Sequence, residues 1–229
     1  MNVKQFRYSR DNFSYLIDNG TIALAIDPGA SGNILNYLKE RGLKLLYAAN
    51  THSHYDHTHG NADILKQSGA EYLDNKTLIK KGKIVLGNEI LVYHTPGHSE
   101  DSICFHTGNY LISGDTLFNG TIGNCFSGNL RAFYDSIKLI MSLPKETIVY
   151  AGHDYIRDSM KYAGMMVPDN PYIEEFLRKL NPDDIFSTLE DELNINPFLR
   201  FNDPGIIALL KRKGLPVDTE FDRWKALMS

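Results

Sequence analysis

The sequence has few of the features that mark secreted, membrane or nucleic-acid-binding proteins. Only two of its 229 residues are cysteines, Cys104 and Cys125, which is too few for a disulfide framework. No apolar run approaches the roughly 18 residues that a membrane span needs, and the opening MNVKQFRYSRDNF lacks the apolar segment of a secretory signal. The formal net charge of −4 is mild. We therefore expect a cytoplasmic protein whose partners are neither nucleic acids nor membranes.

What the chain does have is a mixed pattern of strands and helices, with 42% hydrophobic residues for a core. Residues 13–29 predict two short strands joined by a turn at Asn19 and Gly20. Residues 43–50 predict a buried strand, and further strands are expected within 83–95, 102–114 and 147–152. Apolar periodicity and terminal glycines predict helices at 31–42, 61–69 and 129–143.

The character of the sequence changes near residue 166. Strands alternate with helices up to about Met165, whereas no strand is predicted from Val167 onward. The later residues are charged, helical in pattern and punctuated by prolines. We therefore predict an α/β domain at residues 1–166 and a small helical region at residues 167–229.

The segment THSHYDHTHG at residues 51–60 contains four of the eight histidines in the chain. His52 and His54 directly follow the predicted strand 43–50, and side chains two residues apart can converge only in extended chain. Asp56 and His57 come where the chain turns toward the next helix. A charged aspartate among histidines has no packing rationale, and imidazole and carboxylate ligands suit zinc, iron or manganese. The segment therefore predicts a metal site.

Three more candidate ligands follow other predicted strands, each beside a glycine: His98, Asp115 and His153. Sites in open α/β sheets gather beyond the carboxyl ends of strands. Seven candidates at four strand ends favour two metal ions, with Asp115 able to bridge them. The remaining histidines in this part of the chain are interpreted as supporting residues: His59 next to the ligands, His94 as a residue that packs or orients a neighbour, and His106 as structural.

Four segments in this order, THSHYDHTHGN, HTPGHSEDSICF, SGDTLF and AGHDY, resemble the consecutive motifs of the metallo-β-lactamase superfamily, in particular of its hydroxyacylglutathione hydrolase (glyoxalase II) branch. NINPFLRFN resembles an element of that branch's helical C-terminal domain. The resemblance implies an α/β fold, an αββα sandwich with a small helical C-terminal domain. It also implies two divalent ions, zinc or iron with manganese as a further candidate. Their ligands would be His52, His54 and His98 for one ion and Asp56, His57 and His153 for the other, with Asp115 as the bridge.

The implied reaction is hydrolysis of an S-(2-hydroxyacyl)glutathione to a hydroxy acid and a free thiol. Metal coordination lowers the pKa of bound water from about 15.7 to about 7. The leaving thiolate, whose thiol has a pKa of about 8.5, requires no strong general acid. The catalytic residues would be Asp115, beside the nucleophilic water, and Asp56, which would orient it.

The resemblance also implies substrate contacts at Asn124, Phe126 and Tyr155. Asn124 stands where the branch has a basic residue that contacts glutathione, whereas Phe126 occupies an aromatic position and Tyr155 matches a glutathione-contacting tyrosine. The chain stops at FDRWKALMS, short of further basic contacts. Arg223, Lys225 and the basic run 211–213 are candidates to replace them. We predict a thioester hydrolase that depends less on glutathione than its branch does.

Three alternatives stay open. A persulfide dioxygenase would use a single iron on the same scaffold, although the NPFLR segment and the lack of a Gly-Cys-Gly-Arg loop oppose it. A thioesterase acting on a different small thiol would use the same ligands. A non-catalytic binding module is disfavoured by the complete set of seven ligands.

Overall fold

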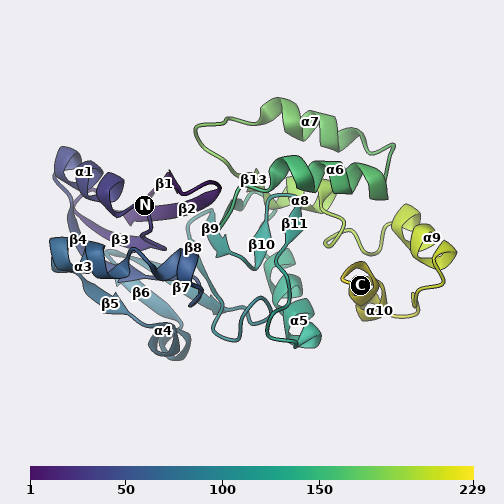
Figure 1. Ribbon diagram of the computed structural model, residues 1–229, viewed down its shortest axis with the longest axis horizontal. Coiled ribbons are helices and arrows are strands. Elements are labelled where there is room, and N and C mark those ends of the chain that lie inside the picture. The colour runs from purple at the N-terminus through teal and green to yellow at the C-terminus, as the bar shows by residue number, and fades with distance from the viewer.

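Two β-sheets packed against each other form the centre of the computed structural model, which describes all residues 1–229 (Figure 1). The first sheet has the order β1-β2-β3-β4-β5, and the second has the order β13-β12-β9-β8-β7-β6. The first contains β1 (Asn2–Tyr8), β2 (Asn12–Asp18), β3 (Ile22–Ile26), β4 (Lys44–Ala49) and β5 (Glu71–Leu73). The second contains β6 (Lys83–Leu86), β7 (Asn88–His94), β8 (Ile103–Thr107), β9 (Tyr110–Gly114), β12 (Ile148–Ala151) and β13 (Ser187–Thr188), and a separate hairpin pairs β10 (Leu117–Phe118) with β11 (Thr121–Ile122).

Helices cover the outer face of each sheet, so that the layers run α, β, β, α (Figure 1). On the first sheet, α1 (Ser31–Arg41) and α3 (Asn61–Ser68) bury Ile34, Leu38 and Ile64 against leucine and alanine side chains of the strands. On the second sheet, α5 (Leu130–Met141) and the C-terminal helices form another core. The remaining helices are α2 (Tyr55–Thr58), α4 (Asn75–Lys81), α6 (Ile156–Met166), α7 (Pro171–Lys179), α8 (Leu189–Ile195), α9 (Pro204–Arg212) and α10 (Glu220–Leu227).

The core between the sheets arises from the alternation of side chains along the strands. In β2, Tyr15 and Ile17 face the second sheet, whereas Leu16 faces the helices outside. The Tyr15 hydroxyl donates to the Ala151 carbonyl at 2.6 Å, which ties the two sheets together at the end of β12. The predicted αββα sandwich is therefore confirmed.

Most of the predicted elements are present, and their ends have the expected chemistry. β2 and β3 are antiparallel and meet at Asn19 and Gly20, where Gly20 has a φ of +88°. The predicted helices at 31–42 and 61–69 are α1 and α3, and both end at glycines in the left-handed conformation. The strands expected within 83–95 and 102–114 are each a pair of antiparallel strands.

The prediction that no strand follows Val167 is wrong. β13 pairs antiparallel with β12, with Val149 opposite Ser187 and Ile148 opposite Thr188. A strand of two residues has no apolar alternation, so its pairing is decided by the free edge of β12 rather than by local sequence. No helix of the chain has the length and apolar content that a membrane crossing requires.

The C-terminal region is also connected to the rest of the fold through a buried glutamate. Glu192 of α8 is fully buried and accepts hydrogen bonds from the Gly120 backbone N–H, at 2.9 and 3.0 Å, and from Asn196. Asn196 in turn donates to the Thr121 carbonyl. These contacts hold the turn between β10 and β11. Burial raises the pKa of the Glu192 carboxyl to about 7.

The Glu192→Gln variant tests this coupling through the pH dependence of stability. Between pH 4.5 and 7 the folded chain keeps the Glu192 proton while the unfolded chain releases it, so the free energy of unfolding falls as the pH rises. The native glutamate should cost up to about 3 kcal/mol by pH 8, and Glu192→Gln should remove this slope. We expect the difference in free energy of unfolding between variant and parent to favour the variant more at pH 8 than at pH 5.

Chemical denaturation at the two pH values measures the effect. Glu190→Gln, at an exposed site in the same helix, is the control and should show no such change. An equal difference at both pH values for Glu192→Gln would contradict the burial argument.

Candidate metal centre

The residues after β4 bring the first candidate ligands to the edge of the sheets. The backbone of His54 is extended, with φ −63° and ψ 146°, and forms the N-cap of α2. His52 and His54 therefore point to the same place, as the sequence predicted. Asp56 and His57 lie within α2, a single helical turn, and their side chains face a neighbouring point.

The other candidates come from the second sheet. Asp115 and His153 follow β9 and β12, which are parallel neighbours and therefore end at the same edge. His98 lies in the turn between β7 and β8. Gly152 is required here because a Cβ atom at this position would lie 2.1 Å from Asp115 Oδ1. The glycine thus allows β12 to approach the carboxylate.

Three imidazoles form a first group of donor atoms. His54 Nδ1 lies 2.9 Å from His52 Nε2 and 3.0 Å from His98 Nε2. A second group combines His57, His153 and Asp56: the two Nε2 atoms are 3.3 Å apart, and His153 Nε2 is 3.3 Å from Asp56 Oδ2.

Asp115 lies between the two groups. Its Oδ1 is 3.3 Å from His57 Nε2, and its Oδ2 is 3.5 Å from both His98 Nε2 and His153 Nε2. The carboxylate is buried, and Oδ1 has no hydrogen-bond partner. The structure therefore brings all seven predicted residues together around one carboxylate.

Asp27 is an important residue that the sequence analysis missed. Its fully buried carboxylate accepts from the Thr51 backbone N–H and hydroxyl, both at 2.7 Å, and lies 2.9 Å from His57 Nδ1. The Thr51 hydroxyl in turn contacts His52 Nδ1 at 3.1 Å. A signal was present, because Asp27 ends a strand as Asp115 does, but it stands in a Pro-Gly turn that was interpreted only as a strand end.

The β1–β2 hairpin supplies further contacts that the sequence analysis did not identify. Asn12 donates to Asp56 Oδ2 at 3.0 Å, and Asp11 Oδ1 is 3.2 Å from His153 Nδ1. The Tyr8 hydroxyl donates to the Asp56 carbonyl at 2.7 Å. On the other side, the Asn124 carbonyl lies 3.0 Å from His98 Nδ1. With the contacts of His52 and His57 described above, four of the five imidazoles have Nδ1 in contact with a polar group on the outer side of the site. Their Nε2 atoms therefore face inward.

The charges at the site differ between the two groups. In the first group, burial lowers the pKa of His52 to about 4 and also lowers the pKa of His98, which favours the neutral form of these two imidazoles. Burial also lowers the pKa of His153, but the Asp115 and Asp56 carboxylates outweigh it and raise that pKa to about 10. Burial alone would raise the pKa of Asp115, but the His153 and His57 imidazoles that face its oxygens hold that pKa well below its usual value. A hydrogen bond from His153 likewise lowers the pKa of Asp56, so Asp115 and Asp56 are both ionised.

The donor atoms fit metal ions. Two imidazole nitrogens bound to one tetrahedral ion at about 2.0–2.1 Å would be separated by about 3.3 Å, close to the distances found here. Inward lone pairs, an unpartnered buried carboxylate oxygen and the absence of thiolate suit zinc, iron or manganese. Three sets of donors lie close enough to share an ion, because the ligand atoms of each set are within 4.8 Å of one another. The sets are His52, His54 and His98; His52, His57 and Asp115; and Asp56, His57 and His153.

The other histidines lie outside the donor groups. His59 is exposed at the end of α2, where its Nδ1 contacts the Asp56 carbonyl at 3.2 Å. His94 Nε2 lies 2.9 Å from the Glu100 carbonyl, across the turn that carries His98. His106 contacts the Tyr93 hydroxyl in the sheet, far along β8 from the site.

Aromatic residues surround the opening of the site. Phe126 is 68% exposed and its ring centroid is 5.2 Å from that of His98. Tyr155 stacks on His153 with ring centroids 5.1 Å apart. Tyr55, between two candidate ligands, is 82% exposed. A substrate entering here would contact aromatic faces before it reached the donor atoms.

Asn124 lies beside a hollow of about 300 Å³ between its loop and the C-terminal residues, which Tyr162, Phe198 and Met228 also line. No basic residue lines this hollow. Arg223, a suggested replacement, is instead bound to Asn202 and to the Val217 carbonyl. Lys225 and the run 211–213 are exposed and do not line it either.

Comparison with known protein families agrees with this geometry. The family model of the metallo-β-lactamase superfamily matches residues 8–73 and 69–153, and the model of the hydroxyacylglutathione hydrolase C-terminus matches residues 154–227. The structure resembles ETHE1 from Myxococcus xanthus in fold, with a TM-score of 0.70 and 23% identity over 100% of both chains. A metallo-β-lactamase from Staphylococcus aureus gives a TM-score of 0.60 and 25% identity over 86% of this chain and 72% of that chain.

Relatives of similar length indicate which branch of this superfamily the chain resembles. The chain is 33% identical to a hydroxyacylglutathione hydrolase from Citrobacter koseri, over 93% of this chain and 92% of the relative. It is 34% identical to a hydroxyacylglutathione hydrolase from Nitrosomonas europaea, over 93% of this chain and 88% of the relative. The chain therefore belongs to the metallo-β-lactamase superfamily and, within it, to the hydroxyacylglutathione hydrolase family. It is a metal-dependent hydrolase, as the motifs predicted.

The position of Asp27 leads to a prediction about metal affinity. In Asp27→Asn, the amide would donate to His57 Nδ1 and leave the ring proton on Nε2, where a ligand lone pair is needed. We expect metal affinity to fall about 10–100-fold. Competition with a chromogenic chelator measures the change, and Asp63→Asn, an exposed carboxylate on α3, is the control. Unchanged affinity in Asp27→Asn would show that His57 does not depend on Asp27 for its tautomer.

Proposed function

We propose that this protein is a binuclear metal-dependent thioester hydrolase that cleaves an S-(2-hydroxyacyl)glutathione-like substrate to a hydroxy acid and a free thiol. The observation that carries the proposal is the position of Asp115, whose carboxylate lies within 3.5 Å of imidazole nitrogens from both donor groups. The names of the curated relatives, hydroxyacylglutathione hydrolases, support the substrate class. We further propose residues 1–166 as the catalytic domain and residues 167–229 as a region that contributes to substrate binding.

In this proposal His52, His54 and His98 hold one ion, and Asp56, His57 and His153 hold the other, with Asp115 between them. Ions bound there would lower the pKa of a coordinated water and polarise the thioester carbonyl. The Asp56 side chain, whose Oδ2 accepts from Asn12, is half exposed and can also accept a hydrogen bond from the attacking water. Asp27, Thr51 and the Asn124 carbonyl keep the imidazoles in the tautomers that binding requires.

Metal stoichiometry tests the binuclear proposal. Elemental analysis of purified, metal-supplemented protein should find two ions per chain. Asp115→Ala should lower occupancy and reduce turnover by more than about a hundredfold, because a ligand matters more than the residues that orient ligands. Asp158→Ala, at an exposed position of α6, should retain both.

A fixed stoichiometry of one ion, with full activity in Asp115→Ala, would contradict this proposal. A single bound iron would instead favour the persulfide dioxygenase alternative. The likeness to ETHE1 is one of fold alone, and the match to hydroxyacylglutathione hydrolases across most of the chain opposes that alternative.

The thiol half of the substrate is the part in which this chain departs from its family. We infer that glutathione is held less tightly than usual, because charge-assisted hydrogen bonds hold carboxylates best and no basic side chain lines the hollow beside Asn124. Phe126 and Tyr155 remain as aromatic contacts. Esters of another small thiol therefore stay as alternative substrates of the same chemistry.

Asn124→Lys tests this inference. The added cation should lower the KM for lactoylglutathione about tenfold, as expected for one regained charge-assisted hydrogen bond, with little change in kcat. Asn124→Gln is the neutral control, and simpler thiol esters should not respond to either change. A strong preference of the parent protein for the glutathione ester that Asn124→Lys leaves unimproved would show that other groups hold the carboxylates.

A further inference from the structure

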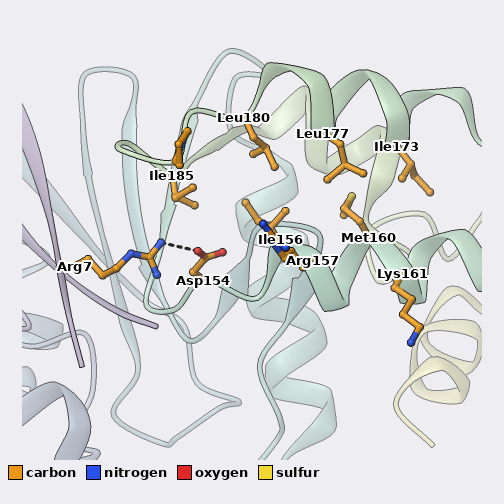
Figure 2. Close-up of a pocket in the computed structure, with 11 residues that line it drawn as sticks. Arg7, Asp154, Ile156, Arg157, Met160, Lys161, Ile173, Leu177, Leu180 and Ile185 are labelled. Carbon is orange, nitrogen blue, oxygen red and sulfur yellow. Dashed lines mark hydrogen bonds and ion pairs between the residues drawn. The ribbon is translucent and has the colours of Figure 1, made fainter. Parts of the chain in front are cut away.

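A large cavity lies apart from the metal centre. It has a volume of about 730 Å³ and lies between α6, α7 and the segment that leads to β13 (Figure 2). Pockets that bind small molecules typically measure about 300–1,000 Å³. Asp154, which follows His153, lines the cavity, but none of the seven candidate metal ligands does. The cavity is therefore separate from the proposed reaction site.

Six apolar side chains make up most of the cavity wall. Ile156, Met160 and Ile185 are almost fully buried, whereas Leu177 of α7 is 41% exposed. Figure 2 shows side chains of α6 and α7 facing each other across the space. The six are Ile156, Met160, Ile173, Leu177, Leu180 and Ile185.

The charged residues of the cavity are mainly basic. Arg7, Arg157 and Lys161 line it, together with a single acidic residue, Asp154. Arg7 pairs with Asp154 at 2.6 Å (Figure 2). Arg157 and Lys161 are exposed and form no ion pair. In a chain with a net charge of −4, this is a local excess of positive charge beside an apolar wall.

We propose that this cavity binds a free amphipathic anion, a medium-length acyl chain that ends in a carboxylate. The apolar wall would take the chain, and Arg157 and Lys161 would take the carboxylate, because unpaired cations beside an apolar surface complement this combination of charge and hydrophobicity. The assignment is independent of the reaction at the metal centre.

A chain of contacts leads from the edge of the cavity to His153. Arg7 lies on β1, its guanidinium stands over the Phe13 ring at 4.7 Å, and its partner Asp154 is adjacent to His153. The Asp154 backbone N–H donates to the Asp11 carbonyl, and Asp11 contacts His153.

Calorimetric titration of the metal-loaded, full-length protein with sodium decanoate tests the proposal. We expect one saturable site per chain with a submillimolar Kd. Decanol should bind more weakly because it lacks the charge, and decyltrimethylammonium should not bind because its charge is of the wrong sign. No saturable binding of decanoate would overturn the proposal.

Variants locate the site. Leu177→Glu places a carboxylate at the opening and should weaken decanoate binding at least about tenfold. Leu139→Glu is the matched control, since Leu139 of α5 is similarly exposed, at 38%, but lies elsewhere. The double variant Arg157→Gln/Lys161→Gln should weaken decanoate binding about tenfold and leave decanol binding unchanged.

Three further results would each overturn the proposal. Decanoate binding that is lost in Asp115→Ala but kept in Leu177→Glu would place the carboxylate at the metal centre. Binding to phosphatidylglycerol vesicles without binding of free decanoate would indicate a membrane surface. A dimer that Leu177→Glu dissociates, measured by analytical ultracentrifugation, would show that a second copy of the chain covers this face.

Discussion

The structure depends on holding metal-ligating groups close together. Imidazole nitrogens and carboxylate oxygens from four separate segments lie 2.9 to 3.5 Å apart, and with the nitrogen lone pairs turned inward this arrangement would be electrostatically unfavourable without cations. The fold stabilises this arrangement through contacts to the outer nitrogens of the imidazoles. Asp27 holds His57 and, through Thr51, reaches His52, while Asp11 and the Asn124 carbonyl hold His153 and His98. Because both sheets contribute residues, the centre can exist only after the sandwich has formed.

The C-terminal region takes part in this arrangement without contributing a metal ligand. Glu192 and Asn196 bind the backbone at Gly120 and Thr121, and Asn119 reaches both the Val149 carbonyl and the Ser187 hydroxyl. This hairpin leads into the loop that carries Asn124 and Phe126. The NPFLR segment therefore has a structural explanation in this chain. Its first residue, Asn196, positions the loop whose Asn124 carbonyl contacts His98 Nδ1. Packing of the helical region thus reaches both the metal centre and the substrate opening.

Sequence alone could predict the residues whose pattern is local. The alternation of His52 and His54 after an apolar strand indicated converging ligands, and Gly42 and Gly69 marked helix ends. Asp27 and β13 could not be found in this way, for different reasons. Asp27 acts through residues about 25 to 30 positions away, so its role exists only in the folded chain. β13 has two residues, and its pairing is decided by the exposed edge of β12. The hairpin residues Asp11 and Asn12 likewise gain their roles only through tertiary contact.

The same reasoning explains why scaffold likeness does not decide the reaction. ETHE1 shares the fold at 23% identity, because the sandwich requires only apolar alternation and a few close-packed positions such as Gly152. Substrate choice depends instead on exposed residues that the fold does not constrain. Asn124 shows this separation within one residue: its carbonyl orients a buried imidazole, whereas its side chain is exposed at the hollow. The backbone contact does not depend on the side chain, so substitutions at this position can alter the hollow, the proposed thiol site, while the candidate metal ligands stay in place.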